Sequence, residues 1–469
     1  MSGKKRLIAA AIVLILAGGL IFGVKRIQNA SEENGGDGRT TLVLWYTDPA
    51  LTDFLSREAV AYGKHAGNAR VRPVLVSGVG FLEAVGEASA IGEDFPDLYI
   101  TTHDNLEKAA LAGLAVDVEK PGDVLRGDNY PAAALNAVSW HGRPIAYPFY
   151  GETTALLYNR TYLENEVRTA AEMDARPVPE GEELEAAVQE LIPETLEDLL
   201  AFAGNYNAPD EVEAVFQFHA GDLFTDYFFA GDAISVGGEA GDDSGVVDIY
   251  NEKALTCMDI FQQMSQFFAM DPDAVNEETI LTDFLEGRIV FTISTTDAVR
   301  RIAEAEEGGD SPFEFGAAPL FRLTDDLDTR ALSVTNCLVV NGFSEHVTEA
   351  GHFAKFLSES GTDGLYREAG KMTARYRADF GTDPAVQEMM QAYQRVYENS
   401  VPMPKMLETS NYWIRLEIAF ADIWRGEEVN ATMKRVAEQL MTQISGTETQ
   451  LAPIADFPRV ELSEELSEE

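Results

Sequence analysis

Polar side chains that could bind a small solute follow two predicted strands, at the point where each strand ends. Thr47 and Asp48 come directly after one apolar run. Thr101 and Asp104 follow another. Because ligands of α/β sheets collect at the carboxyl ends of strands, these hydroxyl and carboxylate groups could hydrogen-bond a polar solute. Asp48 and Asp104 could equally cap the helices that follow.

The chain carries no sequence signature of the common hydrolases or nucleotide-binding enzymes. It has no H-E-x-x-H zinc motif, no G-x-S-x-G elbow and no Walker A loop. The six histidines lack the spacing of metal ligands, so we expect no metal and no other cofactor. A pair of glycosidase carboxylates leaves little sequence signal. We nevertheless expect a protein that is not an enzyme.

The segments that must position these residues alternate between strand and helix patterns. Strands are expected at 41–46, 71–76 and 97–100, with helices at 50–65, 81–90 and 105–111. This order predicts a parallel sheet with helices on both faces. Strand character returns at 288–294 and 333–340, and amphipathic helices are expected at 346–359, 386–397 and 427–445.

The first 26 residues indicate a segment directed to the membrane. Basic residues precede an uncharged run from Leu7 to Val24, and Lys25 and Arg26 follow it. As a helix this run would be about 27 Å long, close to the apolar thickness of a bilayer. The basic flank and the lack of a lipobox cysteine favour a retained single-pass anchor in the cell membrane, with the main domain extracytoplasmic. A cleaved signal peptide and secretion are the alternative.

Composition limits the possible partners. The net charge is −44, from 35 basic and 79 acidic residues, which repels nucleic acid. The apolar content of 45% is normal for a globular protein, and the length allows two domains with sizeable cores. Cys257 and Cys337 are not in a C-x-x-C pair; a disulfide is possible, although two buried thiols are favoured.

Six segments in order resemble the extracellular solute-binding proteins of ABC importers, specifically the maltose-binding-protein-like group (family 1). The resemblance runs from about residue 41 to residue 447. The segments are Leu42–Trp45, Phe95–Tyr99, Gly142–Pro148 with Glu152 and Leu156–Arg160, Phe284–Phe291, Val401–Pro404 with Tyr412 and Trp413, and Arg425–Glu428.

This resemblance implies an α/β, type II periplasmic-binding-protein-like fold with two lobes, a hinge and a ligand cleft between them. The N-lobe would comprise residues 40–150 and 337–383, and the C-lobe residues 151–336 and 384–447. Residues 1–26 would be the anchor or signal peptide, 27–39 a linker and 448–469 an acidic tail. Crossings are expected near Tyr150–Ala155, near Asn336 and near residue 383.

The function implied is capture of a small polar solute, with a sugar or oligosaccharide favoured, by hinge closure. A monomer would then deliver the solute to the permease subunits of an ABC importer. The alternative is a membrane-tethered sensor or scaffold that keeps the fold and feeds no permease.

The resemblance also implies particular site residues. Asp104 and Glu152 match carboxylates that accept sugar hydroxyls, and Trp413 matches a Trp that stacks on a sugar ring. Thr47 and Asp48 match a polar loop. Glu152 could instead be a solvated hinge residue, and Trp413 could belong to the core.

The chain departs from the family where the family places other binding groups. Thr101 and Asp297 stand where the family has Trp, Asn105 replaces an Arg, and Leu223 falls near a stacking Tyr. Three aromatic rings that would stack on a sugar are missing, so the family resemblance does not imply that maltodextrin is the ligand. A smaller or more polar sugar, or another polar solute, fits as well. Rings that could replace the platforms are Tyr46, Tyr150 and Tyr227.

Overall fold

The computed structural model describes residues 39–462, apart from residues 68, 93, 269, 273, 310, 360, 361, 363, 377–379, 382 and 410. The predicted membrane segment at residues 7–24 lies outside this part of the chain. Among the described residues, no helix combines the length and the apolar character needed to cross a bilayer. The N-terminal anchor therefore stays a prediction.

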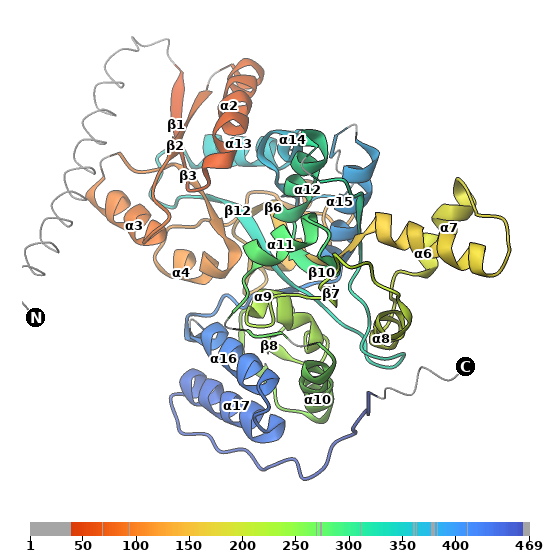
Figure 1. Ribbon diagram of the computed structural model, residues 1–469. Helices are drawn as coiled ribbons and strands as arrows, with labels where there is room; N and C mark the ends of the chain where they lie inside the picture. The colour runs from red at the N-terminus through yellow and green to blue at the C-terminus, as the bar shows by residue number, and fades with distance from the viewer. Residues whose placement is uncertain are drawn as a thin grey trace, which may run out of the picture.

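One mixed sheet of ten strands connects the two lobes (Figure 1). Its order is β2-β1-β3-β12-β6-β10-β7, with β11 and β13 also paired to β6 and β14 paired to β12. β1 (Thr40–Tyr46) is parallel to β2 (Ala69–Leu75) and to β3 (Leu98–Thr102). β12 (Leu332–Val340) is antiparallel to β3 and to β6 (Tyr147–Asn159). The sheet is therefore not all parallel, because β6 and β12 run in opposite directions between the lobes.

The N-lobe is built on β1, β2 and β3, which alternate with helices as the sequence predicts. Leu42, Leu44 and Tyr46 point to the same buried side of β1, because side chains alternate along a strand. The other elements of this lobe are η1 (Pro49–Leu51), α2 (Thr52–Ala66), α3 (Phe81–Ile91), η2 (His103–Asn105), α4 (Leu106–Leu111), η3 (Pro121–Asp123), α5 (Ala132–Ala137), β4 (Ser139–Trp140), β5 (Arg143–Pro144), α13 (Val347–Glu359), α14 (Leu365–Ala369) and β13 (Met372–Thr373).

The C-lobe surrounds β7 and β10 and has an aromatic core. The ring centroid of Phe261 lies 4.8 Å from that of Phe229 and 5.0 Å from that of Trp424. Its elements are α6 (Arg160–Met173), α7 (Glu182–Glu190), α8 (Leu196–Asn205), β7 (Ala214–Phe216), α9 (Leu223–Asp226), η4 (Tyr227–Phe229), β8 (Ser235–Gly237), β9 (Asp243–Asp248), α10 (Glu252–Phe267), α11 (Glu277–Leu285), β10 (Ile289–Thr295), α12 (Asp297–Gly308), β11 (Phe315–Ala318), α15 (Pro384–Glu398), β14 (Val401–Pro402), η5 (Leu407–Thr409), α16 (Tyr412–Trp424) and α17 (Val429–Ser445).

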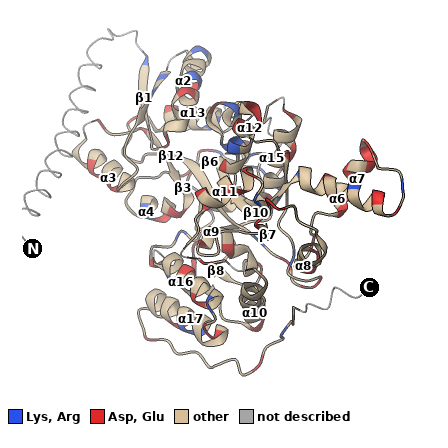
Figure 2. Cartoon of the chain, viewed as in Figure 1, with Lys and Arg blue, Asp and Glu red and all other residues tan. Residues whose placement is uncertain are grey.

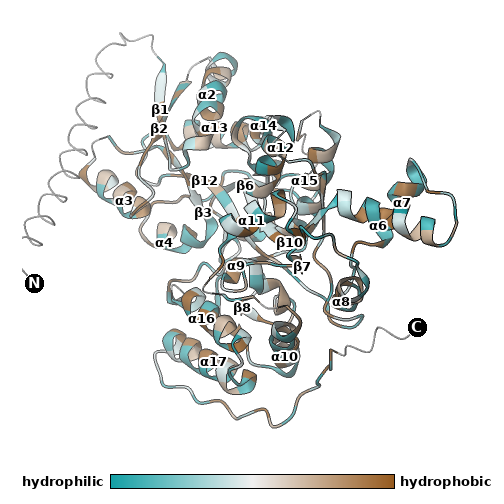
Figure 3. Ribbon diagram, viewed as in Figure 1, coloured by the Kyte–Doolittle hydropathy of each residue, from teal (hydrophilic) through white to brown (hydrophobic). Residues whose placement is uncertain are grey.

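The surface helices of the C-lobe are amphipathic, as α16 and α17 show in Figure 3. Beyond α17, the chain extends along the outside of this lobe (Figure 1). Thr256 of α10 donates a hydrogen bond to the Pro458 carbonyl at 2.7 Å, and Arg459 pairs with Asp259 at 2.9 Å. Phe457 is buried. The extension up to residue 462 is therefore held against α10.

β6 and β12 pass from one lobe into the other. The first part of β6 pairs with β12, and residues Thr154 to Asn159 pair with β10 and β11. Every residue of β6 is buried except Glu152, which is partly exposed. The register of β12 against β6 shifts between Asn336 and Cys337. Such an irregularity re-aims neighbouring side chains, and the candidate site lies beside it.

Candidate functional site

A lysine that the sequence did not single out collects three of the predicted site residues. The Nζ atom of Lys371 lies 3.1 Å from Oδ2 of Asp48 and 3.4 Å from Oδ1 of Asp297. The same ammonium sits 5.7 Å above the ring of Tyr150, within reach of a cation–π interaction. Glu152 is close enough to act on the charge of Lys371. We call these five residues the Lys371 cluster.

The members of the Lys371 cluster come from both lobes and from the strand that crosses between them. Asp48 follows β1 of the N-lobe, and Asp297 begins α12 of the C-lobe. Tyr150 and Glu152 lie on the crossing strand β6, and Lys371 immediately precedes β13, which pairs with β6. A single ammonium therefore joins both lobes and the segment between them.

The electrostatics of the cluster depend on the balance between burial and charge. Burial raises the pKa of Glu152 above its usual 4.5; Asp297 and Asp48 raise it further, while Lys371 opposes them. Burial lowers the pKa of Lys371, but the surrounding carboxylates outweigh burial and raise it above 10.5. Lys371 is thus held as a cation among three acids, and the cluster is negative overall when all are ionised.

Asp48 serves as both a helix cap and a cluster member. Its Oδ1 accepts a hydrogen bond from the Ala50 amide at 2.9 Å and caps η1. Its Oδ2 faces Lys371. Asn336 donates to Oε1 of Glu152 at 3.4 Å, a long contact. The helix cap expected from the sequence is therefore present, and ligand binding by Asp48 stays a prediction.

A second polar group lies around His103, which contacts Thr335 of β12, the residue before the Asn336 that bonds to Glu152. The Thr335 amide donates to Nδ1 of His103 at 3.1 Å, so Nδ1 accepts and Nε2 carries the proton. Nε2 then donates to the Met403 carbonyl at 3.0 Å. Burial lowers the pKa of His103 to about 4, and the nearby Lys405 adds to this effect. His103 is therefore a neutral link between η2 and the segment after β14.

Lys405 joins the same segment to the N-lobe. Its buried Nζ donates to the carbonyls of Asn136, Ala137 and Ser139 at 2.8, 3.0 and 2.6 Å. The carbonyls of Asn136 and Ala137 lie at the end of α5, where the helix dipole favours a cation, and that of Ser139 is in β4. Glu107 of α4 accepts from the Leu407 amide at 2.6 Å. The residues after β14 thus bind the N-lobe over several hydrogen bonds.

The remaining predicted site residues of the N-lobe lie near His103. Oδ1 of Asp104 is buried and has no hydrogen-bond partner among the described residues. Asp104 makes no capping hydrogen bond for η2 or α4, whose N-caps are Thr102 and Asn105. Asn105 turns back and donates to Thr102 at 2.9 Å. Thr101 is buried within β3, opposite Cys337. Asp104 therefore has a buried acceptor that no described residue uses.

Thr47 adjoins the cluster through Asp48, whereas Trp413 has other neighbours. The Thr47 side chain lies close to Gly78, in the loop after β2. Trp413 is partly buried at the start of α16, and its ring centroid lies 5.1 Å from Tyr412 and 6.1 Å from Tyr227. Of the rings proposed as replacement platforms, Tyr150 faces Lys371. Tyr227 faces Trp413, and the buried Tyr46 donates to Thr52.

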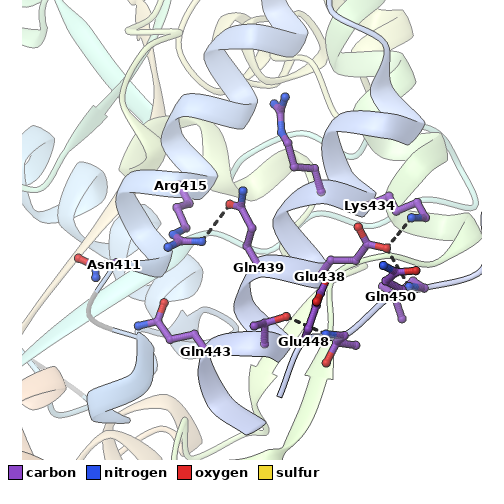
Figure 4. A pocket seen from close by; sticks show the side chains of 12 residues that line it. Asn411, Arg415, Lys434, Glu438, Gln439, Gln443, Glu448 and Gln450 are labelled. Atoms are coloured by element: carbon purple, nitrogen blue, oxygen red, sulfur yellow. Dashed lines mark hydrogen bonds and ion pairs between the residues drawn. The ribbon is translucent and has the colours of Figure 1, made fainter. Parts of the chain in front are cut away.

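A separate cavity of about 760 Å³ lies away from both groups, between α16, α17 and the C-terminal extension (Figure 4). Arg415 of α16 donates to Gln439 of α17 at 2.9 Å, and Lys434 pairs with Glu438 along α17. Both cysteines are buried free thiols, and no set of metal-ligating side chains occurs in the described part of the chain.

Two lobes joined by crossing strands, with polar side chains from both lobes meeting between them, define the two-lobed α/β fold of the extracellular solute-binding proteins. Solved structures with this fold include a cyclo/maltodextrin-binding protein in complex with maltotetraose, at a TM-score of 0.68 and 19% identity. The similarity covers 88% of this chain and 98% of that one. The fold predicted from the sequence is therefore confirmed.

Two bacterial proteins show the same likeness. An extracellular solute-binding protein from Staphylococcus aureus in complex with maltose has a TM-score of 0.67 at 19% identity, covering 88% of this chain and 98% of its own. The maltose-binding periplasmic protein MalE from Listeria monocytogenes, also with maltose, has a TM-score of 0.67 at 16% identity, covering 88% and 100%. No family model matches the chain, and no curated protein matches it.

Lys371 and Lys405 were not predicted from the sequence. Lys371 stands between a glycine and a two-residue strand, and nothing local distinguishes it from a surface lysine. Lys405 follows Val401–Pro404, a segment that was recognised only for its likeness to a ligand-side loop. Both lysines are functional candidates through distant partners, which a single sequence does not reveal.

Proposed function

We propose that this protein is the extracytoplasmic solute-binding component of an ABC importer, and that it captures a small polar solute between its lobes. The observation that carries this proposal is the convergence of Asp48, Glu152 and Asp297 around Lys371. A solute that replaced or joined Lys371 would contact both lobes at once. Such contacts are what a hinge-closing ligand needs, because only differential binding shifts the equilibrium toward closure.

A carbohydrate is the favoured solute. Carboxylates and amides accept or donate hydrogen bonds to hydroxyl groups, and a ring such as Tyr150 can cover an apolar sugar face. Solved proteins with this fold include ones in complex with maltose and with maltotetraose, which supports a sugar as the class of ligand. With Thr101 and Asp297 at positions where the family has Trp, we propose a more polar sugar than a maltodextrin.

The same proposal includes delivery to membrane subunits and the absence of catalysis. The predicted N-terminal segment would hold the protein at the cell membrane as a monomer. The loaded, closed form would then be the species that a permease recognises. The likeness of the fold to binding proteins supports a role in binding rather than in catalysis.

A thermal-shift screen against mono- and oligosaccharides tests the proposal, because a ligand that binds only the folded state raises the melting temperature. Calorimetry with a positive sugar should then show about a ten- to hundredfold loss of affinity in Glu152→Gln, since a charged hydrogen-bond partner is removed. Glu307→Gln, at an exposed position near the other end of α12, is the matched control. Unchanged affinity in Glu152→Gln would place the site elsewhere.

Trp413 provides a separate readout for the same sugar. If its ring stacks on the ligand, its fluorescence should shift on binding, and Trp413→Ala should lose much of the affinity. If Trp413 only packs against Tyr227 and Tyr412, the substitution should lower the melting temperature and leave affinity close to normal. Measuring both quantities on one variant separates these roles.

A further inference from the structure

A basic groove lies on the N-lobe of this strongly acidic protein. The groove has a volume of about 850 Å³, and four of its twelve lining residues are basic while none is acidic. In the whole chain, acids outnumber basic residues by 79 to 35. The basic residues are Arg39, Lys64, Arg70 and Arg72.

Three of the four basic side chains of the groove are not paired with neighbouring acids. Within the described residues, Lys64, Arg70 and Arg72 form no ion pair, and Nε of Arg70 donates only to the Thr41 hydroxyl, at 2.7 Å. By contrast, Arg57 on the same helix α2 pairs with Glu58 and with Glu368. The groove therefore keeps a local positive charge, because ionic screening limits the influence of more distant acids to about 8 Å at physiological salt.

The groove lies at the opposite end of the strands from the candidate site. It is formed by the start of β1, the start of β2 and the last turns of α2, where Figure 2 shows Lys and Arg gathered. Asp48 follows the other end of β1, which is about 20 Å long. In the described part of the chain, β1 is the only strand paired to β2, so the outer edge of β2 is open on this side.

The structure also places the groove where the chain enters the fold. Arg39, the first described residue, lines it. If residues 7–24 anchor the chain, the predicted linker at residues 27–39 can span at most about 45 Å. The groove is then within reach of the lipid headgroups. The tether would raise their effective concentration to the millimolar range, so a weak contact would suffice.

We propose that this groove binds the phosphate groups of anionic phospholipids and fixes the orientation of the N-lobe on the membrane. Lys and Arg side chains close to an anionic surface each strengthen binding by roughly fivefold. In this orientation the carboxyl ends of β1 and β3, with the candidate site, would point away from the bilayer. The proposal depends on the predicted anchor and not on the identity of the solute.

Hydrogen exchange of the full chain in lipid nanodiscs tests the proposal. Amides of β2 should exchange more slowly in discs of phosphatidylcholine mixed with phosphatidylglycerol than in discs of phosphatidylcholine alone. The double variant Lys64→Gln/Arg72→Gln should lose this difference, because about a 25-fold weakening is expected from two charges. Arg126→Gln/Arg176→Gln has the same net charge and removes exposed arginines outside the groove, so it should behave as the wild type.

Each other outcome of this experiment counts against the proposal. Equal exchange in the two lipids, or an equal loss in the control variant, would overturn the headgroup contact. Slowing by inorganic phosphate in phosphatidylcholine discs, to the same extent, would show a small-anion site rather than a membrane contact. A chain that does not co-purify with the discs would remove the tether. High salt should abolish the slowing, because the screening length falls to about 3 Å at 1 M.

Discussion

Lys371→Met removes the cation that joins the lobes, and we expect it to lower the free energy of unfolding by about 2–4 kcal/mol near neutral pH. The pair with Asp297 contributes little, since that carboxylate is 56% exposed and exposed pairs are worth about 0–1 kcal/mol. The pair with the less exposed Asp48 adds about 1–2 kcal/mol. The rest comes from Glu152, whose carboxylate would lose its nearby cation. Removing the partner of a fully buried charge costs about 3–5 kcal/mol. The cost for Glu152 is smaller, because Glu152 is only partly buried.

The pH dependence identifies which carboxylate causes the loss. The pKa of Glu152 is raised in the folded state, so below its usual value of 4.5 the group is neutral in both states and costs nothing. As the pH rises further, the unfolded chain releases the proton first, and stability falls until the pH passes the folded pKa. Without Lys371 the folded pKa is higher still, so the difference between variant and wild type should grow with pH.

Urea unfolding of four chains over a pH series provides the assay. In the Lys371→Met background, adding Glu152→Gln should restore the part of the lost stability that Glu152 causes, because the uncompensated charge is gone. Adding Glu307→Gln, at an exposed position, should restore none. A loss that is the same at about pH 4.5 and at neutral pH, and that Glu152→Gln does not reduce, would refute the electrostatic explanation. Lys371 would then act only through the packing of its chain over Tyr150.

Three further substitutions test other parts of the fold. Both carboxylate oxygens of Asp226 are buried without partners among the described residues. Burial raises the pKa of Asp226 well above 3.8. The free energy of unfolding therefore falls as the pH rises past 3.8. Asp226→Asn should therefore be more stable by about 1–3 kcal/mol near neutral pH in urea titrations, and a less stable variant would contradict this. Lys405→Met removes the ammonium to which three carbonyls bond and should lose about 3–5 kcal/mol; a loss below about 1 kcal/mol would show that water replaces the ammonium. Gly151→Ala places a Cβ 2.6 Å from the Tyr397 ring and should lower the melting temperature, whereas Gly204→Ala, with open space around it, should not.

The fold could be predicted because its information is local and repeated. The pattern at 41–46 places Leu42, Leu44 and Tyr46 on one side of a strand, and the structure has β1 at Thr40–Tyr46. The expected helix at 50–65 is α2, Thr52–Ala66. The antiparallel pairing of β12 with β3 and β6 was not predicted. Strand direction depends on the path of the connections between lobes, and an apolar run carries no direction.

The site could be predicted only in part, since its chemistry depends on distant partners. Asp48 and Asp104 were found because they follow strands, and the structure shows that only Asp48 joins Lys371. Glu152 and Asp297 were predicted from the family resemblance. In the structure, both lie close enough to Lys371 to raise its pKa. Thr101 and Asn105 match positions of the family, yet one is buried within β3 and the other bonds to its own turn.

The negative charge of Asp297 and the positive charge of Lys371 compensate each other. Where the resemblance leads one to expect an aromatic ring, this chain has a carboxylate, and a third acid next to Asp48 and Glu152 would repel them without a cation. Lys371 supplies that cation, and its position over Tyr150 covers a ring face that a sugar could otherwise use. Under the proposed function, a solute would therefore compete with an ammonium for the same acceptors and for the same ring. Hydroxyl groups can share these acceptors with Lys371, whereas an apolar ligand would leave them unpaired, so we expect selection for solutes rich in hydrogen-bond donors.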